Sequence, residues 1–367
     1  DNIGVNSTDE TLFGVGIDVY GNSPGSENTV RYNRIKNTGY TGLYFRGKSF
    51  VEYNYITHTC LVKDDGGGIY TPSATSYDSK IRYNIVLNSI GSNEGLPKDR
   101  RNANGIYLDE PTGNILVEFN TVAYCNGGGI FLHYNGGTEV NSNISFGNRY
   151  GLLASREWGV NNFKNNVVYS LNKSDEAEEH QILARSHNRA GSIIYDNNTY
   201  IHPYNSDAPF KRTSMPESSY YDFEEWKEIT RQDANSTINL TPLATGETEQ
   251  LFYNDTKQNK TFNLGTSVYK DIYGNEVTGK LTLAPFKSKI LIKTTKTVKV
   301  NQSPVINDQL FNIAAPLNQN DLVGEVLATD PDAGQTITYS IIDGNESGYF
   351  NISSTTGEIR ANVDIQL

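Results

Sequence analysis

Three short segments, KDDGGGIYT (residues 63–71), NGIYLDEPTGN (104–114) and CNGGGIFLHYNGG (125–137), repeat one pattern in the middle of the chain. In each segment glycine leads into isoleucine and an aromatic residue, and ionisable side chains stand at the edges. Two further segments, GLYFR from Gly42 and GLLAS from Gly151, have a similar pattern. Self-similarity of this kind indicates a repeat architecture.

A second repeated element is a hydrophobic residue followed shortly by asparagine, as in VRYNRI and VEYNYI. These asparagines are Asn33, Asn54, Asn84, Asn120, Asn143, Asn166 and Asn197. Their spacings indicate a minimal coil of about 22 residues with inserts, which is typical of a parallel β-helix. Stacked asparagines can hydrogen-bond along one corner. The crossover rule predicts a right-handed coil.

The composition supports an all-β fold and excludes two classes of partner. The 367 residues include 33 Gly and 24 Tyr, and Gly and Asn favour turns over helices. The net charge of −11 argues against nucleic acid, because phosphate neutralisation requires Lys and Arg. No apolar run reaches the length of a membrane-spanning helix, so no membrane partner is expected. We expect a monomer.

The repeated pattern predicts a parallel β-helix catalytic domain over residues 1–215. Because FGVGIDVYGN near the start has the same pattern, we expect further coils before it. Phe223, Trp226 and Ile229 have helical spacing, which predicts a capping helix within residues 216–237.

Two smaller β modules are expected to follow the cap. Residues 238–297 alternate strands with turn signals, which predicts a small β-sandwich. Residues 304–367 contain VGEVLATDPDAGQTITYSI and resemble a cadherin-type repeat. That resemblance implies calcium ligands at Asp330 and Asp332. The last strands of such a module would lie beyond the end of the chain, so we expect a truncated cadherin-like β-sandwich.

The repeated strands can be placed in register because a strand alternates its side chains between two faces. One outward column contains Tyr44, Tyr70, Tyr107, Phe131 and Leu153, and the next contains Arg46, Pro72, Asp109, His133 and Ser155. An aromatic row beside an ionisable row suits the apolar faces and hydroxyls of a sugar chain. Stacked tyrosines that only stabilise the coils are the alternative.

Glycoside cleavage requires two carboxyl groups, of which one donates a proton and the other acts as nucleophile or base. Asp109 is the first candidate, because it projects outward with His133 on the next coil to hold it. Asp65 is its expected catalytic partner, since the glycines at 66–68 would let the chain fold back toward Asp109. A simple turn-forming role for Asp65 is the alternative. His133 completes the predicted catalytic set.

Other residues near these columns are predicted to bind substrate. They are Glu110, Arg100, Arg101, Arg156, Glu157 and Trp158, in addition to Tyr44, Arg46, Tyr70, Tyr107 and Phe131. The arginines would bind sulfate or carboxylate groups of an anionic glycan. A solvated, unoccupied charged loop is the alternative for Arg100 and Arg101.

These motifs resemble right-handed β-helix carbohydrate-active enzymes of marine and gut bacteria. DDGGGIYT, NGIYLDE, FEEWKEITRQDANS and LAPFKSKILI are similar to segments of family 141 glycoside hydrolases, which act as α-L-fucosidases or xylanases, and of β-helix fucanases. The resemblance covers residues 14–295 and implies a catalytic pair at Asp65 and Asp109. It further implies a secreted or cell-surface bacterial hydrolase that needs no cofactor and cleaves a fucose-containing sulfated or other algal glycan.

Two other functions are open at this point. A polysaccharide lyase would use a Lys, Arg, His or Tyr base, often with calcium neutralising a uronate. Arg46, His133 and Tyr107 could serve as the base, and the carboxylates would then be calcium ligands. A non-catalytic glycan-binding or adhesive solenoid would use the same surface without turnover.

Overall fold

The fold was analysed in a computed structural model of the chain. It describes residues 14–21, 27–92, 102–171, 182–187, 192–204, 208–214, 217–299, 301–314 and 316–366. The chain forms two compact units, which divide between Thr297 and Val298. None of the helices in the described parts of the chain has the length and apolar character needed to cross a membrane.

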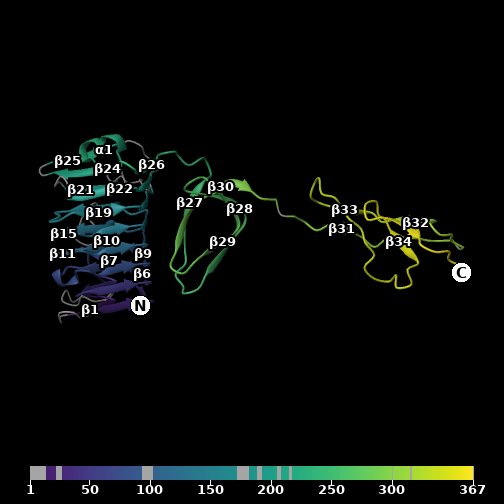
Figure 1. The fold of residues 1–367 in the computed structure, drawn as a ribbon, viewed down its shortest axis with the longest axis horizontal. Coiled ribbons are helices and arrows are strands. Elements are labelled where there is room, and N and C mark those ends of the chain that lie inside the picture. Colours follow the sequence, from purple (N-terminus) through teal and green to yellow (C-terminus); the bar gives the residue numbers. More distant parts are fainter. Residues whose placement is uncertain are drawn as a thin grey trace. The chain divides into compact units, whose positions relative to one another are not determined.

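The first unit contains a right-handed parallel β-helix, as predicted, in which successive coils stack their strands into three parallel sheets (Figure 1). The first sheet contains β1 (Ile17–Tyr20), β4 (Leu43–Arg46), β7 (Gly66–Thr71), β10 (Ala103–Leu108), β14 (Gly128–His133), β18 (Tyr150–Ser155), β21 (Ile182–His187) and β24 (Phe210–Ser214), with β25 (Glu217–Tyr221) added antiparallel. The candidate site lies at the ends of these strands.

The other two sheets complete each coil. The second sheet contains β2 (Asn28–Arg31), β5 (Ser49–Glu52), β8 (Lys80–Arg82), β12 (Leu116–Glu118), β16 (Glu139–Asn141), β19 (Asn161–Lys164) and β22 (Ile193–Asp196). The third sheet contains β3 (Arg34–Lys36), β6 (Tyr55–Thr59), β9 (Ile85–Ser89), β13 (Thr121–Ala123), β17 (Ile144–Phe146), β20 (Val167–Tyr169), β23 (Thr199–Ile201) and β26 (Thr237–Asn239). Between the first and second sheets lie the 3-10 turn η1 (Ala74–Ser76) and the short strands β11 (Thr112–Gly113) and β15 (Asn135–Gly136).

The repeated glycines let the first sheet lie close against the third. A Cβ atom on Gly68 would lie 2.2 Å from Cγ1 of Val86, and one on Gly105 would lie 2.0 Å from Cγ1 of Val122. These distances are far below van der Waals contact, so no side chain fits at either position. The prediction that the glycines at 66–68 form a turn was wrong, because all three belong to the extended strand β7.

Gly68→Ala should therefore destabilise the fold by roughly 1–3 kcal/mol, the usual cost of overpacking a core. Val86→Ala removes the methyl group that the new Cβ would strike, so the double variant should lose less stability than the two single variants lose together. Urea unfolding of the wild type, both single variants and the double variant measures this coupling. Strictly additive losses would contradict the contact.

An asparagine ladder follows the corner between the second and third sheets. Oδ1 of each ladder residue accepts hydrogen bonds of 2.9–3.1 Å from the backbone N and Nδ2 of the preceding rung. The predicted rungs from Asn33 to Asn166 are confirmed, but the next rung is Asn198 and not Asn197. Asn197 is the residue directly before the rung and has a left-handed backbone conformation, with φ 55. Tyr53 and Tyr83 have the same conformation directly before the rungs Asn54 and Asn84.

The single helix of the described chain, α1 (Phe223–Thr230), lies at the end of the β-helix opposite β1 (Figure 1). Asp222 and Glu225 form a capping box at its start. Trp226 is fully buried, stacks on Phe210 of β24 with ring centroids 5.3 Å apart, and donates to Asp233 Oδ2 at 2.9 Å. The helix thus covers the apolar end of the last coil.

A single antiparallel sheet follows, in the order β27 (Thr248–Tyr253), β30 (Ser288–Thr297), β28 (Lys260–Asp271) and β29 (Glu276–Leu283). Register shifts at Gly265, which has φ +61, interrupt the pairing within β28, as at a β-bulge. Leu251, Phe286 and Ile290 join an apolar cluster with residues of the third sheet. The predicted sandwich of two sheets is therefore one sheet that packs against the β-helix.

The second unit contains β31 (Val305–Ile306), β32 (Leu322–Glu325), β33 (Ala328–Thr329), β34 (Phe350–Ile352) and β35 (Glu358–Ala361). Asp332 N donates to Asp330 Oδ1 at 2.7 Å. Within the described chain no third carboxylate, imidazole or thiol completes a cluster with these two aspartates, and calcium takes six to eight oxygen ligands. The calcium site of the cadherin-like module stays a prediction.

Candidate functional site

The outward aromatic column has the predicted register. Tyr44 pairs with Tyr70, Tyr70 with Tyr107, and Tyr107 with Phe131 in adjacent parallel strands. The rings cover one another, and those of Tyr107 and Phe131 stack with centroids 4.6 Å apart. Tyr70, Tyr107 and Phe131 are consequently only 8%, 3% and 7% exposed. The prediction of an open aromatic surface for sugar was therefore wrong for Tyr70, Tyr107 and Phe131, whereas Tyr44 is half-buried.

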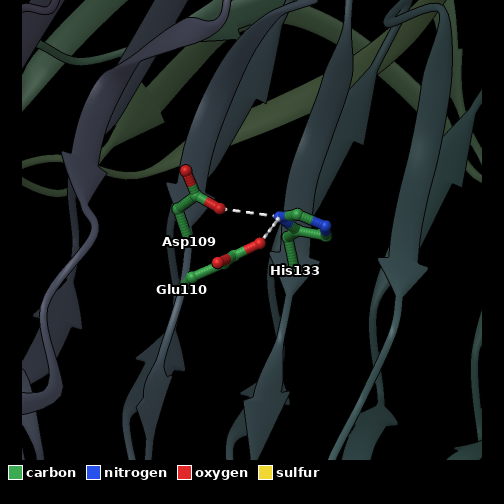
Figure 2. A group of neighbouring side chains, drawn as sticks. All are labelled: Asp109, Glu110 and His133. Carbon is green, nitrogen blue, oxygen red and sulfur yellow. Dashed lines mark hydrogen bonds and ion pairs between the residues drawn. The ribbon is translucent and has the colours of Figure 1, made fainter.

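Asp109 directly follows β10 and is held by a network of hydrogen bonds. Its Oδ2 accepts from the Tyr70 hydroxyl at 2.9 Å, and its Oδ1 lies 2.7 Å from His133 Nδ1 (Figure 2). Burial alone would raise the pKa of Asp109. The hydrogen bonds from His133, the Glu110 backbone and Tyr70 outweigh burial and hold this pKa below its ordinary value. Asp109 is therefore poised as an ionised carboxylate.

Asp65 precedes β7 and has φ 53, so this residue itself makes the turn. Its Oδ1 accepts from Asn102 Nδ2 at 2.7 Å, and its backbone carbonyl accepts from the Tyr40 hydroxyl at 2.8 Å. Desolvation and then the charge of Asp109 raise the pKa of Asp65, against the opposing effect of the Asn102 hydrogen bond. The two predicted catalytic carboxyl groups therefore interact electrostatically. The pKa of Asp65 lies above its ordinary value and the pKa of Asp109 lies below it.

Two residues of this environment, Tyr40 and Asn102, were missed from the sequence. Asn102 N donates to both carboxylate oxygens of Asp64, at 2.9 and 2.8 Å, while its side chain binds Asp65. Asp64 thereby anchors the entry to β10. Neither Tyr40 nor Asn102 belongs to the repeated strand columns, so the strand period gave no signal for them.

Glu110 is exposed, and its Oε1 lies 3.9 Å from His133 Nδ1 (Figure 2). Ligand atoms of Asp109, Glu110 and His133 lie within 4.8 Å of one another, so these residues could together hold a cation. With Asp109 ionised, however, its 2.7 Å contact with His133 is a hydrogen bond that His133 Nδ1 donates, and metal binding through Nδ1 would require loss of that proton. The arrangement therefore fits a hydrogen-bonded network better than a metal centre.

The two predicted cationic residues within the described chain, Arg46 in β4 and Arg156 after β18, are four strands apart in the first sheet. Arg46 pairs with Asp18 at 3.0 Å, and its guanidinium lies 4.4 and 4.5 Å from the ring centroids of Tyr20 and Tyr44. Arg156 is exposed and has φ 57. Arg100 and Arg101 lie outside the described residues.

Glu157 and Trp158 are adjacent in sequence but differ in environment. Glu157 is only 2% exposed, and its Oε2 accepts a hydrogen bond of 3.4 Å from Ser192. The prediction that Glu157 binds substrate was wrong, because the turn after β18 directs this side chain inward. Trp158 is 50% exposed, so its indole is available at the surface.

No protein-family model matches the chain, and none of the curated proteins matches it. Among solved structures, the periplasmic alginate epimerase AlgG aligns at 15% identity over 63% of this chain and 48% of its own, with a TM-score of 0.35; a point mutant of it aligns at 16% over the same shares, with a TM-score of 0.38. The Dettilon tailspike protein aligns at 12% identity over 92% of this chain and 60% of its own, with a TM-score of 0.33. The chain thus spans about half the length of the epimerase structures, and the assignment of its site rests on the contacts described above.

Proposed function

We propose that the protein is a glycoside hydrolase in which Asp65 is the acid and Asp109 the nucleophile or base. The observation that carries this proposal is the contrast between two neighbouring carboxyl groups: hydrogen bonds from His133 and Tyr70 hold Asp109 and lower its pKa, whereas desolvation and the charge of Asp109 raise the pKa of Asp65. Environments that push two carboxyl pKa values apart suit one group to donate a proton and the other to remain ionised. Glycoside hydrolysis requires this pair of states.

Each group has a defined part in bond cleavage. Asp65 donates its proton to the glycosidic oxygen as the bond from that oxygen to the anomeric carbon breaks. Asp109 either attacks the anomeric carbon, forming a glycosyl-enzyme that water hydrolyses, or takes a proton from the attacking water. His133 and Tyr70 hold the Asp109 carboxylate in place through hydrogen bonds of 2.7 and 2.9 Å. They act as positioning residues.

The proposed substrate is a polysaccharide, with a fucose-containing sulfated or other algal glycan as the first choice. The motif resemblance supports this choice, and exposed Arg156 adds a cation near the site for an anionic substituent. A secreted or cell-surface location suits an enzyme that meets such a polymer.

A panel of sulfated fucan, xylan, alginate and pectin tests the reaction directly. Hydrolysis should release new reducing ends without ultraviolet-absorbing unsaturated products, and EDTA should leave the rate unchanged. A metal-assisted lyase is the second candidate, because Asp109, Glu110 and His133 could hold a cation. Unsaturated products together with inhibition by EDTA would replace hydrolysis by that reaction. Binding without any product would support a non-catalytic solenoid.

The dependence of kcat/KM on pH should be bell-shaped with an acidic optimum. The rate requires Asp109 ionised, so it should fall on the acid side as pH drops through a pKa below the ordinary value of 3.8. It also requires Asp65 protonated, so it should fall on the alkaline side as pH rises through a pKa above 3.8. Initial rates across buffers of constant ionic strength measure both limbs. A rate that keeps rising through neutral pH would contradict the assignment of Asp65 as the acid.

A further inference from the structure

Aromatic side chains, two of them exposed and one half-buried, gather beside the candidate site in the turns that leave the first sheet. Tyr134 directly follows His133 and is 40% exposed, and Trp158 is 50% exposed. Tyr77, which follows η1, approaches Trp158 with ring centroids 6.4 Å apart in an edge-to-face arrangement. We call Tyr77, Tyr134 and Trp158 the turn shelf.

The indole of Trp158 is fixed although half of it is exposed. Its Nε1 donates to the Tyr134 carbonyl at 3.0 Å, and its backbone N donates to the Asn135 carbonyl at 3.1 Å. A Cβ atom on Gly113 or on Gly136 would lie 2.9 Å from an indole carbon. The ring therefore lies directly over bare backbone of β11 and β15, where any side chain would displace it.

The turn shelf is continuous with the proposed catalytic groups. Tyr134 contacts His133 edge to face with ring centroids 5.5 Å apart, and His133 in turn contacts Asp109. Exposed Glu110, whose Oε1 lies 3.9 Å from His133 Nδ1, and exposed Arg156, two residues before Trp158, add polar groups to the same turns. An indole that served only to pack a turn would be buried. The indole of Trp158 is instead held by the hydrogen bond of its Nε1, while half of the residue remains exposed to solvent.

We propose that the turn shelf is a sugar-binding subsite, in which Trp158 stacks on the apolar face of a pyranose of the same polysaccharide that Asp65 and Asp109 cleave. This inference rests on the proposed function for the identity of the chain that it holds. Rigid aromatic surface binds sugar through C–H groups at little cost in conformational entropy, and the flanking polar groups bind hydroxyls. The buried column of Tyr70, Tyr107 and Phe131 does not offer such a surface.

Native gel electrophoresis through sulfated fucan, xylan, alginate or pectin tests the subsite without requiring turnover. Wild-type protein should be retarded by at least one of these polymers, and Trp158→Ala should weaken that binding about tenfold or more. Trp158→Phe should restore part of it, because a smaller aromatic face remains. Tyr273→Ala, which removes a 71% exposed ring from the C-terminal part of the first unit, is the matched control and should bind as wild type.

Fluorescence separates loss of the subsite from loss of the fold. The chain has two tryptophans, and Trp226 is fully buried in the cap, so its emission in Trp158→Ala reports on folding. Equal retardation of Trp158→Ala and wild type, or no retardation of wild type by any of the four polymers, would overturn the proposal. Retardation that depends on Trp158 without release of reducing ends would leave the subsite standing and refute only the hydrolase.

Discussion

Asp109→Asn is expected to lower kcat by about 10²–10⁴-fold, the usual contribution of a positioned acid or base. The amide retains the shape of the carboxylate but carries no charge to attack the anomeric carbon or accept a proton. The variant should also lose about 1–3 kcal/mol of stability at neutral pH, because charge-assisted hydrogen bonds at Asp109 are lost. That stability, which comes from a lowered pKa, is present at neutral pH and disappears in the wild type as pH falls through that pKa. Rates on the cleaved polysaccharide and thermal melts at pH 7 measure the two effects.

Asp65→Asn is the matched variant and should differ in one respect. Its kcat should fall by a similar factor, because no proton remains for the glycosidic oxygen. Its melting temperature at pH 7 should be unchanged or higher, since a carboxyl with a raised pKa is unfavourable when ionised in the folded protein. Activity that survives either substitution would remove that residue from the reaction. A large loss of stability in Asp65→Asn would show that Asn102 needs the charge for folding.

Asn120→Ala should have the largest effect on stability, with an expected loss of roughly 3–6 kcal/mol. Asn120 is 1% exposed, and its Oδ1 accepts from both N and Nδ2 of Asn84, while its Nδ2 donates to the carbonyl of Ile81 at 2.8 Å. The substitution leaves the backbone N of Asn84 and the carbonyl of Ile81 without these partners, and each such loss costs about 1–3 kcal/mol. Asn84 Nδ2 loses one of its two acceptors and keeps the Val51 carbonyl, so its loss adds less. Urea unfolding followed by circular dichroism measures the change.

Asn33 provides the control for this prediction within the same ladder. It is the first described rung and is half-buried, and its Nδ2 donates to Asn54 Oδ1 at 3.0 Å. Asn33→Ala should therefore cost only about 1 kcal/mol, the net value of an ordinary hydrogen bond. Similar losses for Asn33→Ala and Asn120→Ala would show that the ladder does not depend on burial.

The strand period predicted the coils and columns because period-two alternation and a fixed coil length constrain register strongly. Asp109 beside His133 followed from that register alone. The burial of Tyr107 could not be predicted from the register, since the sequence does not show whether aromatic rings on adjacent coils are open to solvent or cover one another. The role of Gly68 could not be predicted either, because it depends on the close approach of Gly68 to Val86, which belongs to another sheet of the β-helix.

Turns account for the other differences. Asp65 and Asn197 have positive φ. The sequence did not show that these residues adopt the left-handed conformation, because each has a Gly or Asn beside it that could equally adopt it. The one-residue displacement from Asn197 to Asn198 arose because both are asparagine and both fit the corner. Tyr134 was missed for a similar reason, since its exposure depends on the turn after β14 and not on any strand.

The docking of the sheet of β27–β30 on the β-helix has a consequence for folding during synthesis. Arg34 pairs with Asp255 at 2.8 Å across 221 residues of sequence, and Tyr53 contacts Phe286. Because translation proceeds from the N-terminus, the ribosome releases the coils well before the strands that cover them. The apolar side of the third sheet is therefore open in the nascent chain until Ile290 has emerged. During that interval these uncovered apolar side chains expose the growing protein to aggregation, and the sheet of β27–β30 ends the interval when it docks.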